Sequence, residues 1–173
     1  FHTWELRGAW PAILNDPQMG EQAKSLHTDA LAILDEAAVE GWLQVQARVA
    51  LLPARQSGDD ICVYDPSEPA APIATFHTLR QQNTKSSGRA NHALSDYIAP
   101  GDSPEDWIGL FALTCGSQAE PLAKAARDDH DDYRAILIQA IADRMAEAGS
   151  EWLHREVRTR LWGYAQDESL STK

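Results

Sequence analysis

Two carboxylates, Asp143 and Glu147, form the pair whose residue types and spacing are best suited to chemistry. They are four residues apart, so on a helix they share one face. At 100° per residue, Asp143 lies about 160° from Ile141, away from the apolar stripe. Two carboxylates on one ridge can bind a cation, a ligand amine or a partner's histidine, and a solvated acidic face is the alternative. Their mild repulsion is about 0.2–0.5 kcal/mol, and neither Arg144 nor Lys124 offers an ion pair four residues away.

A histidine and an aspartate, His130 and Asp131, stand side by side within a run of aspartates. Such a pair could ligate a metal in a hydrolase. Adjacent residues on a helix point about 100° apart, however, and a zinc site needs three or four ligands. The sequence has no HxxxH or CxxC pattern. The pattern therefore favours a helix start whose acids complement the macrodipole, with a metal hydrolase as the weaker hypothesis.

The remaining polar residues give weaker signals. His77, Arg80, Gln81 and Gln82 gather at a predicted strand end, where they could form a binding rim or hydrogen-bond to loop carbonyls. Cys115 is interpreted as a buried structural thiol, because a catalytic thiol needs a base to lower its pKa. The six tryptophans are spread evenly, which favours packing over a ligand cage. Phosphate-binding glycine loops, GxSxG and dinucleotide fingerprints are absent from the sequence.

Two helices are predicted to carry most of these residues. The first spans roughly 18–40, begins after Asp16 and Pro17 and ends at Gly41. The second runs without proline from Asp128 to Trp162, with acids at its start and arginines near its end. Gly149 is the position where that long helix could bend or break. Its apolar stripe consists of Tyr133, Leu137, Ile141, Met145, Ala148 and Trp152.

Strands are predicted between the two helices. Residues 45–52 alternate in hydropathy, and Pro53 is expected to end that strand. A turn at 56–60 leads to a strand at 61–64, which makes a hairpin. The proline-rich segment 65–72 is expected to be a loop, followed by a strand at 73–79, a polar loop and a short helix at 91–97. The apolar run 107–113 suits a central strand covered on both faces. The order of elements predicts an α+β domain with a largely antiparallel sheet.

Composition narrows the possible partners and the compartment. The chain has 173 residues, which suits one domain or a fragment, and a formal net charge of −11. This charge argues against nucleic acid and anionic membrane surfaces, and no apolar run approaches the length of a membrane span. Two cysteines, Cys62 and Cys115, indicate a reducing cytosol. The start at Phe1 without methionine and the polar C-terminus look like cuts through a longer polypeptide.

Short strings distributed along the whole chain carry a family resemblance. They are FHTWELRG at 1–8, WPAIL at 10–14, LLPAR at 51–55, GDDI at 58–61, LRQQ at 79–82, LSDYIAP at 94–100, DWIG at 106–109, HDDY at 130–133, ADRMAEA at 142–148 and WGYA at 162–165. In this order they resemble the activation domain of cobalamin-dependent methionine synthase.

The resemblance implies a fold and a role. The fold is α+β, a twisted antiparallel sheet with flanking helices and one long C-terminal helix. The family's enzyme is a cytoplasmic methyltransferase that carries cobalamin and zinc on other modules. Its activation domain binds S-adenosylmethionine and docks on the cobalamin module for reductive remethylation. Flavodoxin or a flavoprotein reductase supplies the electron. Nucleic acid and membranes are not expected partners.

The same resemblance implies site residues. Glu147 corresponds to an adenosylmethionine contact, and Asp143 to a contact with the cobalamin module or its displaced histidine. The family's aspartate would precede Phe1, and its RPAPGYP-like segment would follow Lys173. Residues 1–173 are therefore expected to be the N-terminal part of the domain, with an incomplete ligand site and no catalysis of their own. The alternative function is a partner-docking domain without its own ligand site.

Overall fold

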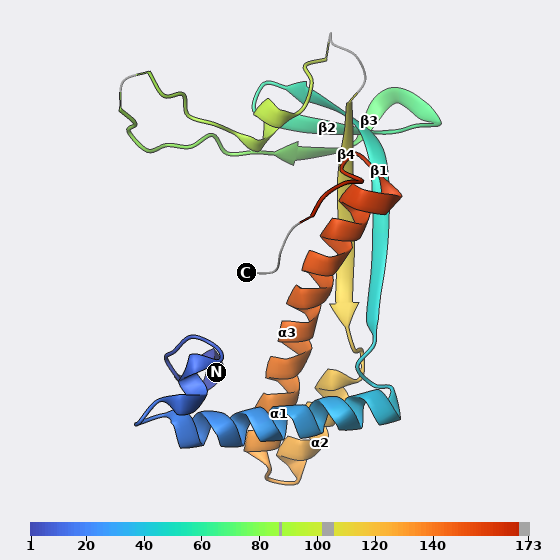
Figure 1. Ribbon diagram of the computed structural model, residues 1–173. Helices are drawn as coiled ribbons and strands as arrows, with labels where there is room; N and C mark the ends of the chain where they lie inside the picture. The colour runs from blue at the N-terminus through green and yellow to red at the C-terminus, as the bar shows by residue number, and fades with distance from the viewer. Residues whose placement is uncertain (87, 102–105, 170–173) are drawn as a thin grey trace. The chain divides into compact units, whose positions relative to one another are not determined.

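The computed structural model describes residues 1–86, 88–101 and 106–169. The chain divides into two compact units (Figure 1). The helical unit contains residues 1–47, 113–161 and those from 165 on, and the sheet unit contains residues 48–112 and 162–164. Strands β1 (Val45–Ser57) and β4 (Asp106–Cys115) contribute residues to both units. In the described part of the chain, no helix is both long and apolar enough to cross a bilayer.

The helical unit is built from α1 (Gly20–Glu40), α2 (Ala119–Asp128) and α3 (Asp132–Glu156). Two short 3-10 turns, His2–Trp4 and Ala12–Asn15, precede α1, and a π-helical turn, Val157–Leu161, follows α3. The prediction of the first helix is confirmed. The Asp16 carboxylate accepts the backbone N–H groups of Gln18 and Met19 just before α1. Gly41 ends the helix with a left-handed φ of 73°, which glycine adopts without strain.

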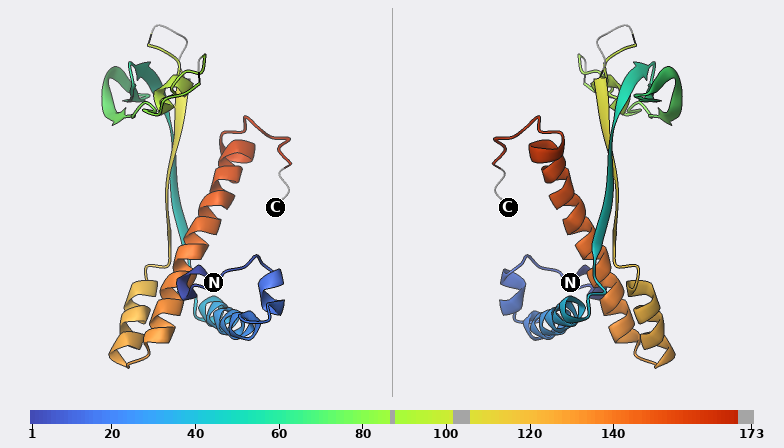
Figure 2. Two further views of the ribbon diagram at one scale, coloured as in Figure 1. Left: turned by 90° about the vertical axis from the view of Figure 1, so that its left-hand side faces the viewer. Right: turned by 90° about the vertical axis from the view of Figure 1, so that its right-hand side faces the viewer.

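Small side chains let α2 and α3 approach closely, side by side (Figure 2). In α2 the buried residues Ala119, Ala123 and Ala126 recur at helical spacing. In α3 the buried alanines Ala135 and Ala142 belong to the same core cluster. Ile138 is the largest side chain of this cluster that is essentially inaccessible, at 1% exposure. The packing of these helices therefore determines where the acidic residues of α3 lie.

The sheet has the strand order β3-β2-β1-β4. Strands β1, β2 (Asp60–Asp65) and β3 (Glu68–His77) pair antiparallel, with Ser57 opposite Asp60 and Asp60 opposite His77. Gly58 and Asp59 make the two-residue turn of the predicted hairpin, which is confirmed. A small core of Ala54, Ile61 and Val63 lies in this unit, which also contains the 3-10 turn η3 (Leu94–Tyr97). The α+β class with an antiparallel sheet and a long helix near the C-terminus is confirmed.

Three strand predictions are wrong. Residues 65–72 are not a loop, because β3 begins at Glu68 and tolerates two prolines at the sheet edge, where register shifts interrupt the pairing. Pro53 does not end β1, since the pairing with β2 begins only at Ala54. Residues 107–113 are not a central strand: β4 is last in the strand order, and Trp107 and Phe111 are exposed.

The long helix predicted from Asp128 to Trp162 is confirmed over Asp132–Leu161, and only its start is wrong. Asp128 belongs to α2, and the helical path is interrupted between Asp128 and Asp132, where His130 adopts a left-handed φ of 62°. The sequence patterns predict no element for residues 117–127, whereas the structure has α2 over Ala119–Asp128. Gly149 does not interrupt α3. A Cβ there would lie 3.2 Å from Val45 Cγ1 and 3.3 Å from Leu113 Cδ1, so two strand side chains pack closely against the helix at this position.

Candidate functional site

Asp143 and Glu147 lie on an exposed ridge of α3, as their spacing predicts. The Glu147 side chain is 61% exposed and forms an ion pair with Arg144, with 2.7 Å between Oε1 and Nη2. The sequence analysis considered only pairs four residues apart, whereas this pair forms at a spacing of three residues. Such exposed ion pairs contribute little to stability, so a positively charged group that binds Glu147 more tightly can displace Arg144.

A hollow of about 420 Å³ lies between the start of α2 and the middle of α3, and Asp143 lines it. Glu120 and Gln139 line it as well. The Glu120 carboxylate accepts hydrogen bonds from Arg127 Nη2 and Gln139 Nε2, each at 2.8 Å. Asp143, in contrast, has no hydrogen bond or ion pair with any described residue. The hollow therefore presents a free carboxylate beside a neutralised one, an arrangement that suits a single positive charge.

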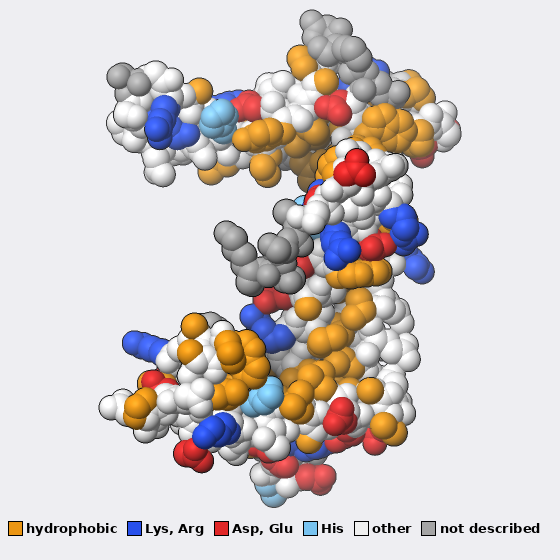
Figure 3. All heavy atoms as spheres, in the orientation of Figure 1, with side chains coloured by type: hydrophobic (Ala, Val, Ile, Leu, Met, Phe, Trp, Pro, Cys, Tyr) orange, Lys and Arg blue, Asp and Glu red, His pale blue; other side chains and the backbone are white. Residues whose placement is uncertain are grey.

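A second, largely apolar hollow of about 330 Å³ lies between α1, α3 and the N-terminal segment. Trp4, Leu34, Ile141 and Met145 supply much of its lining, and Arg144 is one of its few polar residues. Figure 3 shows hydrophobic side chains gathered along α3 and on the N-terminal segment. Arg144 thus connects this apolar hollow with Glu147 on the ridge.

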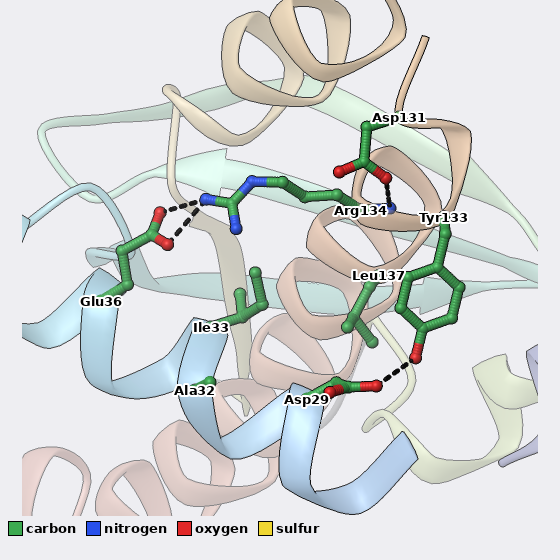
Figure 4. Close-up of a pocket in the computed structure, with 8 residues that line it drawn as sticks. All are labelled: Asp29, Ala32, Ile33, Glu36, Asp131, Tyr133, Arg134 and Leu137. Carbon is green, nitrogen blue, oxygen red and sulfur yellow. Dashed lines mark hydrogen bonds and ion pairs between the residues drawn. The ribbon is translucent and has the colours of Figure 1, made fainter. Parts of the chain in front are cut away.

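Polar pairs join α1 to the start of α3 (Figure 4). The Tyr133 hydroxyl donates to Asp29 Oδ2 at 2.7 Å, and Arg134 Nη2 lies 2.6 Å from both carboxylate oxygens of Glu36. Burial raises the pKa of Tyr133 to about 12, and the hydrogen bond to Asp29 is the second cause of this increase. Asp131 caps α3 by accepting the backbone N–H of Arg134. The same side chains line a hollow of about 230 Å³ between the two helices. They are occupied in holding these helices together, so we interpret this hollow as structural.

The metal hypothesis for His130 and Asp131 receives no support. The Asp131 carboxylate is engaged as the cap of α3, and His130 lies in the turn before it. Across residues 1–86, 88–101 and 106–169, no group of three or more histidine, cysteine or acidic side chains is arranged to hold a metal ion. The resemblance places no metal on this module either.

Two other interpretations can be judged from burial. Cys115 is buried and unpaired, and burial raises the pKa of its thiol, which agrees with a structural role. The interpretation of the tryptophans as packing residues is only partly right. Trp42 is buried at 6% exposure, whereas four others are substantially exposed: Trp10, Trp107, Trp152 and Trp162.

Arg80 is a structural residue of the sheet unit. It bonds to Asp59 in the hairpin turn, to both carboxylate oxygens of Asp96 and to the carbonyl oxygen of Asn91. Hydrogen bonding to Arg80 holds the pKa of Asp96 well below its usual range. Gln81 and Gln82 bond to loop groups, and His77 is 80% exposed and paired with Asp60. Of the two interpretations, hydrogen bonding within the loops is the one the structure supports.

We expect Arg80→Gln to loosen residues 80–96 and to raise the pKa of Asp96 toward the ordinary value near 3.9. In the unmodified chain that pKa is lowered on folding, so the stabilisation is present above about pH 4 and is lost as pH falls further. Carboxyl-carbon NMR titration and amide hydrogen exchange of Gln81 and Ser95 measure both effects. Arg55→Gln, which removes an exposed arginine from the same unit, is the control. Equal exchange in both variants would contradict the assigned role.

A family model described as the activation domain of vitamin B12 dependent methionine synthase matches residues 1–173. The chain belongs to this family. A solved structure described as the MetH reactivation domain bound to AdoHcy is 44% identical and has a TM-score of 0.92 over 99% of this chain. The resemblance stated from the short strings is therefore confirmed.

This chain covers 53% of the solved reactivation domain, so it spans about half of that domain's length. Within the described residues of this activation-domain chain, α3 supplies the two carried-over acids and α2 supplies Glu120. Glu120 and Gln139 were not singled out from the sequence. Gln139 precedes Asp143 by four residues, a signal for a shared face, whereas Glu120 became recognisable only with α2 in place.

Proposed function

We propose that this chain is the N-terminal part of a module that binds S-adenosylmethionine and docks on the cobalamin module of methionine synthase for reductive remethylation of cob(II)alamin. The observation that carries the proposal is the match to the AdoHcy-bound reactivation domain over 99% of the chain at a TM-score of 0.92. The whole enzyme is a methyltransferase, and this chain is not catalytic by itself.

The chemistry of the ridge fits such a ligand. S-adenosylmethionine carries a sulfonium and an ammonium group, and a carboxylate attracts both through its charge. Glu147 is exposed, and Arg144 is its only partner among the described residues, so Glu147 can exchange that partner for the ligand. When bound, the cofactors supply the chemistry of methyl transfer. The residues of this chain orient the bound ligand and neutralise its positive charge. No acid, base or nucleophile of the chain is required.

Asp143 has a separate role in this proposal. It lies in a hollow whose other carboxylate, on Glu120, is already satisfied by Arg127 and Gln139. A protonated imidazole of the cobalamin module fits this single free charge. We further propose that flavodoxin or a flavoprotein reductase is the electron donor, that the protein is cytoplasmic, and that zinc belongs to another module of the enzyme.

Glu147→Gln should weaken binding of S-adenosylmethionine by about tenfold, the effect of losing one hydrogen bond or ion pair to a charged group. The measurement is calorimetry on a chimera of the MetH reactivation domain. In this chimera, our chain replaces the segment of that domain to which 99% of it aligns. Glu151→Gln, one turn further along α3, is the matched control and should bind as the unmodified chimera does. If the unmodified chimera binds neither S-adenosylmethionine nor AdoHcy, the proposed function is wrong.

Asp143→Asn is expected to weaken docking of the cobalamin module, and more strongly at pH 6 than at pH 8. The reason is that an imidazole with an ordinary pKa near 6.5 is charged only at the lower pH, when the carboxylate attracts it most. Cobalamin absorbance reports the displaced histidine, and Asp35→Asn, an exposed change on α1, is the control. A loss of docking that is independent of pH would refute the assigned partner.

The second candidate function is a partner-docking domain without a ligand site of its own. It is favoured by the net charge of −11 and by the position of Glu147, which lines none of the hollows described above. It predicts no heat with S-adenosylmethionine but an association rate with a basic partner surface that falls as salt rises. An association rate that is insensitive to ionic strength would exclude it.

A further inference from the structure

The sheet unit carries a basic segment, although the chain as a whole is acidic. Between Glu68 and Asp96 the sequence contains no aspartate or glutamate. Three basic residues lie there instead: Arg80, Lys85 and Arg89. The formal charge of this segment is therefore +3, which leaves −14 on the remainder of a chain whose total is −11. The segment lies outside the acidic ridge of α3 and plays no part in the proposed binding of S-adenosylmethionine.

Two arms of this segment, residues 78–81 and 92–95, run antiparallel beside each other. One backbone hydrogen bond of 2.9 Å joins the arms at one end, and Thr78 Oγ1 accepts a backbone N–H at 3.3 Å at the other end. Leu79 and Leu94 occupy facing positions between these two bonds. Facing residues of an antiparallel pair have their side chains on the same side, so the two leucines form one apolar spot.

Tyr97 extends this apolar spot. It follows Leu94 by three residues in η3, and a 3-10 helix has about three residues per turn, so both side chains lie on the same side. Tyr97 is 73% exposed, Leu94 69% and Leu79 83%. The His92 ring lies beside Tyr97, with 6.5 Å between the ring centroids. Large apolar side chains that are exposed next to one another are typical of interaction sites, whereas single ones need no explanation.

Basic side chains follow in the loop that joins the two arms. Lys85 Nζ donates a hydrogen bond of 2.8 Å to the Ala90 carbonyl oxygen, which holds the two sides of this loop together. Arg89 is exposed, and it has no ion pair with any residue that the structure describes. On the sheet unit, Figure 3 shows hydrophobic side chains next to a histidine and a basic side chain. We call five residues together the basic loop surface: Leu79, Leu94, Tyr97, Lys85 and Arg89.

Charge and size indicate the kind of partner that this surface fits. Its cations attract an acidic surface, whereas the −14 on the remainder of the chain repels a polyanion such as nucleic acid. An apolar centre with an aromatic residue and a charged rim is typical of a protein interface. With three large apolar side chains, the surface has the small size of transient electron-transfer encounters, which bury less than about 1,200 Å².

We propose that the basic loop surface docks the electron-donating flavoprotein through an acidic face of that partner. The identity of the partner rests on the proposed function, in which such a flavoprotein supplies the electron. Leu79, Leu94 and Tyr97 form the apolar centre of the contact, and their burial sets the lifetime of the complex. Lys85 and Arg89 steer the acidic partner during the encounter, so they set the association rate.

The test measures association and dissociation rates by biolayer interferometry, with the reactivation-domain chimera immobilised. The probes are purified flavodoxin and, separately, a purified flavoprotein reductase. Arg89→Glu should lower the association rate about fivefold at about 50 mM sodium chloride and leave it almost unchanged at about 500 mM, because salt screens exposed charges. Arg48→Glu makes the same charge change at an exposed position of β1, so it is the matched control and should have a much smaller effect.

The apolar centre is tested separately. Tyr97→Ala should raise the dissociation rate about tenfold, because the contact loses its aromatic anchor. Val39→Ala removes an 88% exposed apolar side chain from α1 and should leave that rate unchanged. Circular dichroism verifies that each variant is folded.

The proposal is overturned if neither flavoprotein binds, or if the control variants change the rates as much as Arg89→Glu and Tyr97→Ala do. Binding of a donor by the 173-residue chain but not by the chimera would assign the surface to the rest of the domain. Self-association of the chain that Tyr97→Ala abolishes, seen by sedimentation, would assign it to a second copy. Calorimetry of the same chimera with S-adenosylmethionine distinguishes failure of this docking surface from failure of the proposed function.

Discussion

Replacing Gly116 with alanine is expected to lower the free energy of unfolding of the helical unit by about 3 kcal/mol. Gly116 has a left-handed φ of 76°, which costs an L-residue with a Cβ about 1–2 kcal/mol. The new Cβ would also lie 2.9 Å from the carbonyl oxygen of Trp42, a backbone atom that cannot rotate away. The start of α2 must therefore shift. Urea denaturation followed by circular dichroism and tryptophan fluorescence measures the loss.

Gly41→Ala in the same unit is the matched control. Gly41 has a similar φ of 73°, but the nearest atom to its new Cβ would be the flexible Gln44 Nε2, at 3.7 Å. Only the conformational cost remains, and we expect a loss of about 1 kcal/mol. Equal losses in the two variants would show that the close approach to Trp42 is not what requires glycine at 116.

Ile138→Ala is expected to destabilise the helical unit by about 3 kcal/mol, through lost apolar burial and the cavity it leaves. Ile138 is 1% exposed and belongs to the cluster that joins α2 and α3. The same substitution should loosen the hollow that contains Asp143, because that hollow lies between these two helices. Equilibrium unfolding gives the first effect, and amide exchange of the residues around Asp143 gives the second.

Ile136→Ala, two residues away on the same helix, separates burial from helix propensity. Ile136 is 44% exposed, so little apolar area is lost, and the higher helix propensity of alanine offsets part of that loss. We expect a change within about 0.5 kcal/mol of zero. A large effect at Ile136 and a small one at Ile138 would mean that the assigned core face of α3 is wrong.

Part of the candidate site could be read from spacing. The ridge of Asp143 and Glu147 follows from a helical period, because residues four apart must share a face wherever the helix packs. Which side of that ridge faces a hollow could not be predicted, because the hollow requires α2, and no pattern in residues 117–127 was recognised. The small alanine face of α2 becomes informative only when it is seen against Ala135 and Ala142.

The structure differs from the local patterns at positions where long-range contacts decide the conformation. Prolines argue against a strand, yet an edge position leaves β3 free of the ladder bonds that proline cannot make. Glycine weakens a helix, yet α3 continues through Gly149, where the side chains of Val45 and Leu113 pack closely against it. Arg80 is next to two amides in the sequence, whereas its carboxylate partners Asp59 and Asp96 come from distant turns.

The sequence alone determined the family, the α+β class, the first helix, the hairpin and the shared face of the two acids. Each of these depends on neighbouring residues or on short ordered strings, which the printed chain displays directly. Only the tertiary structure decided that Arg144 holds Glu147, that Asp143 faces a hollow beside Glu120, and that Leu79 and Leu94 face each other on the sheet unit. Those facts depend on which residues, distant in sequence, pack together and exclude water. Hydrophobic burial drives this packing, and it acts over the whole chain rather than within one segment.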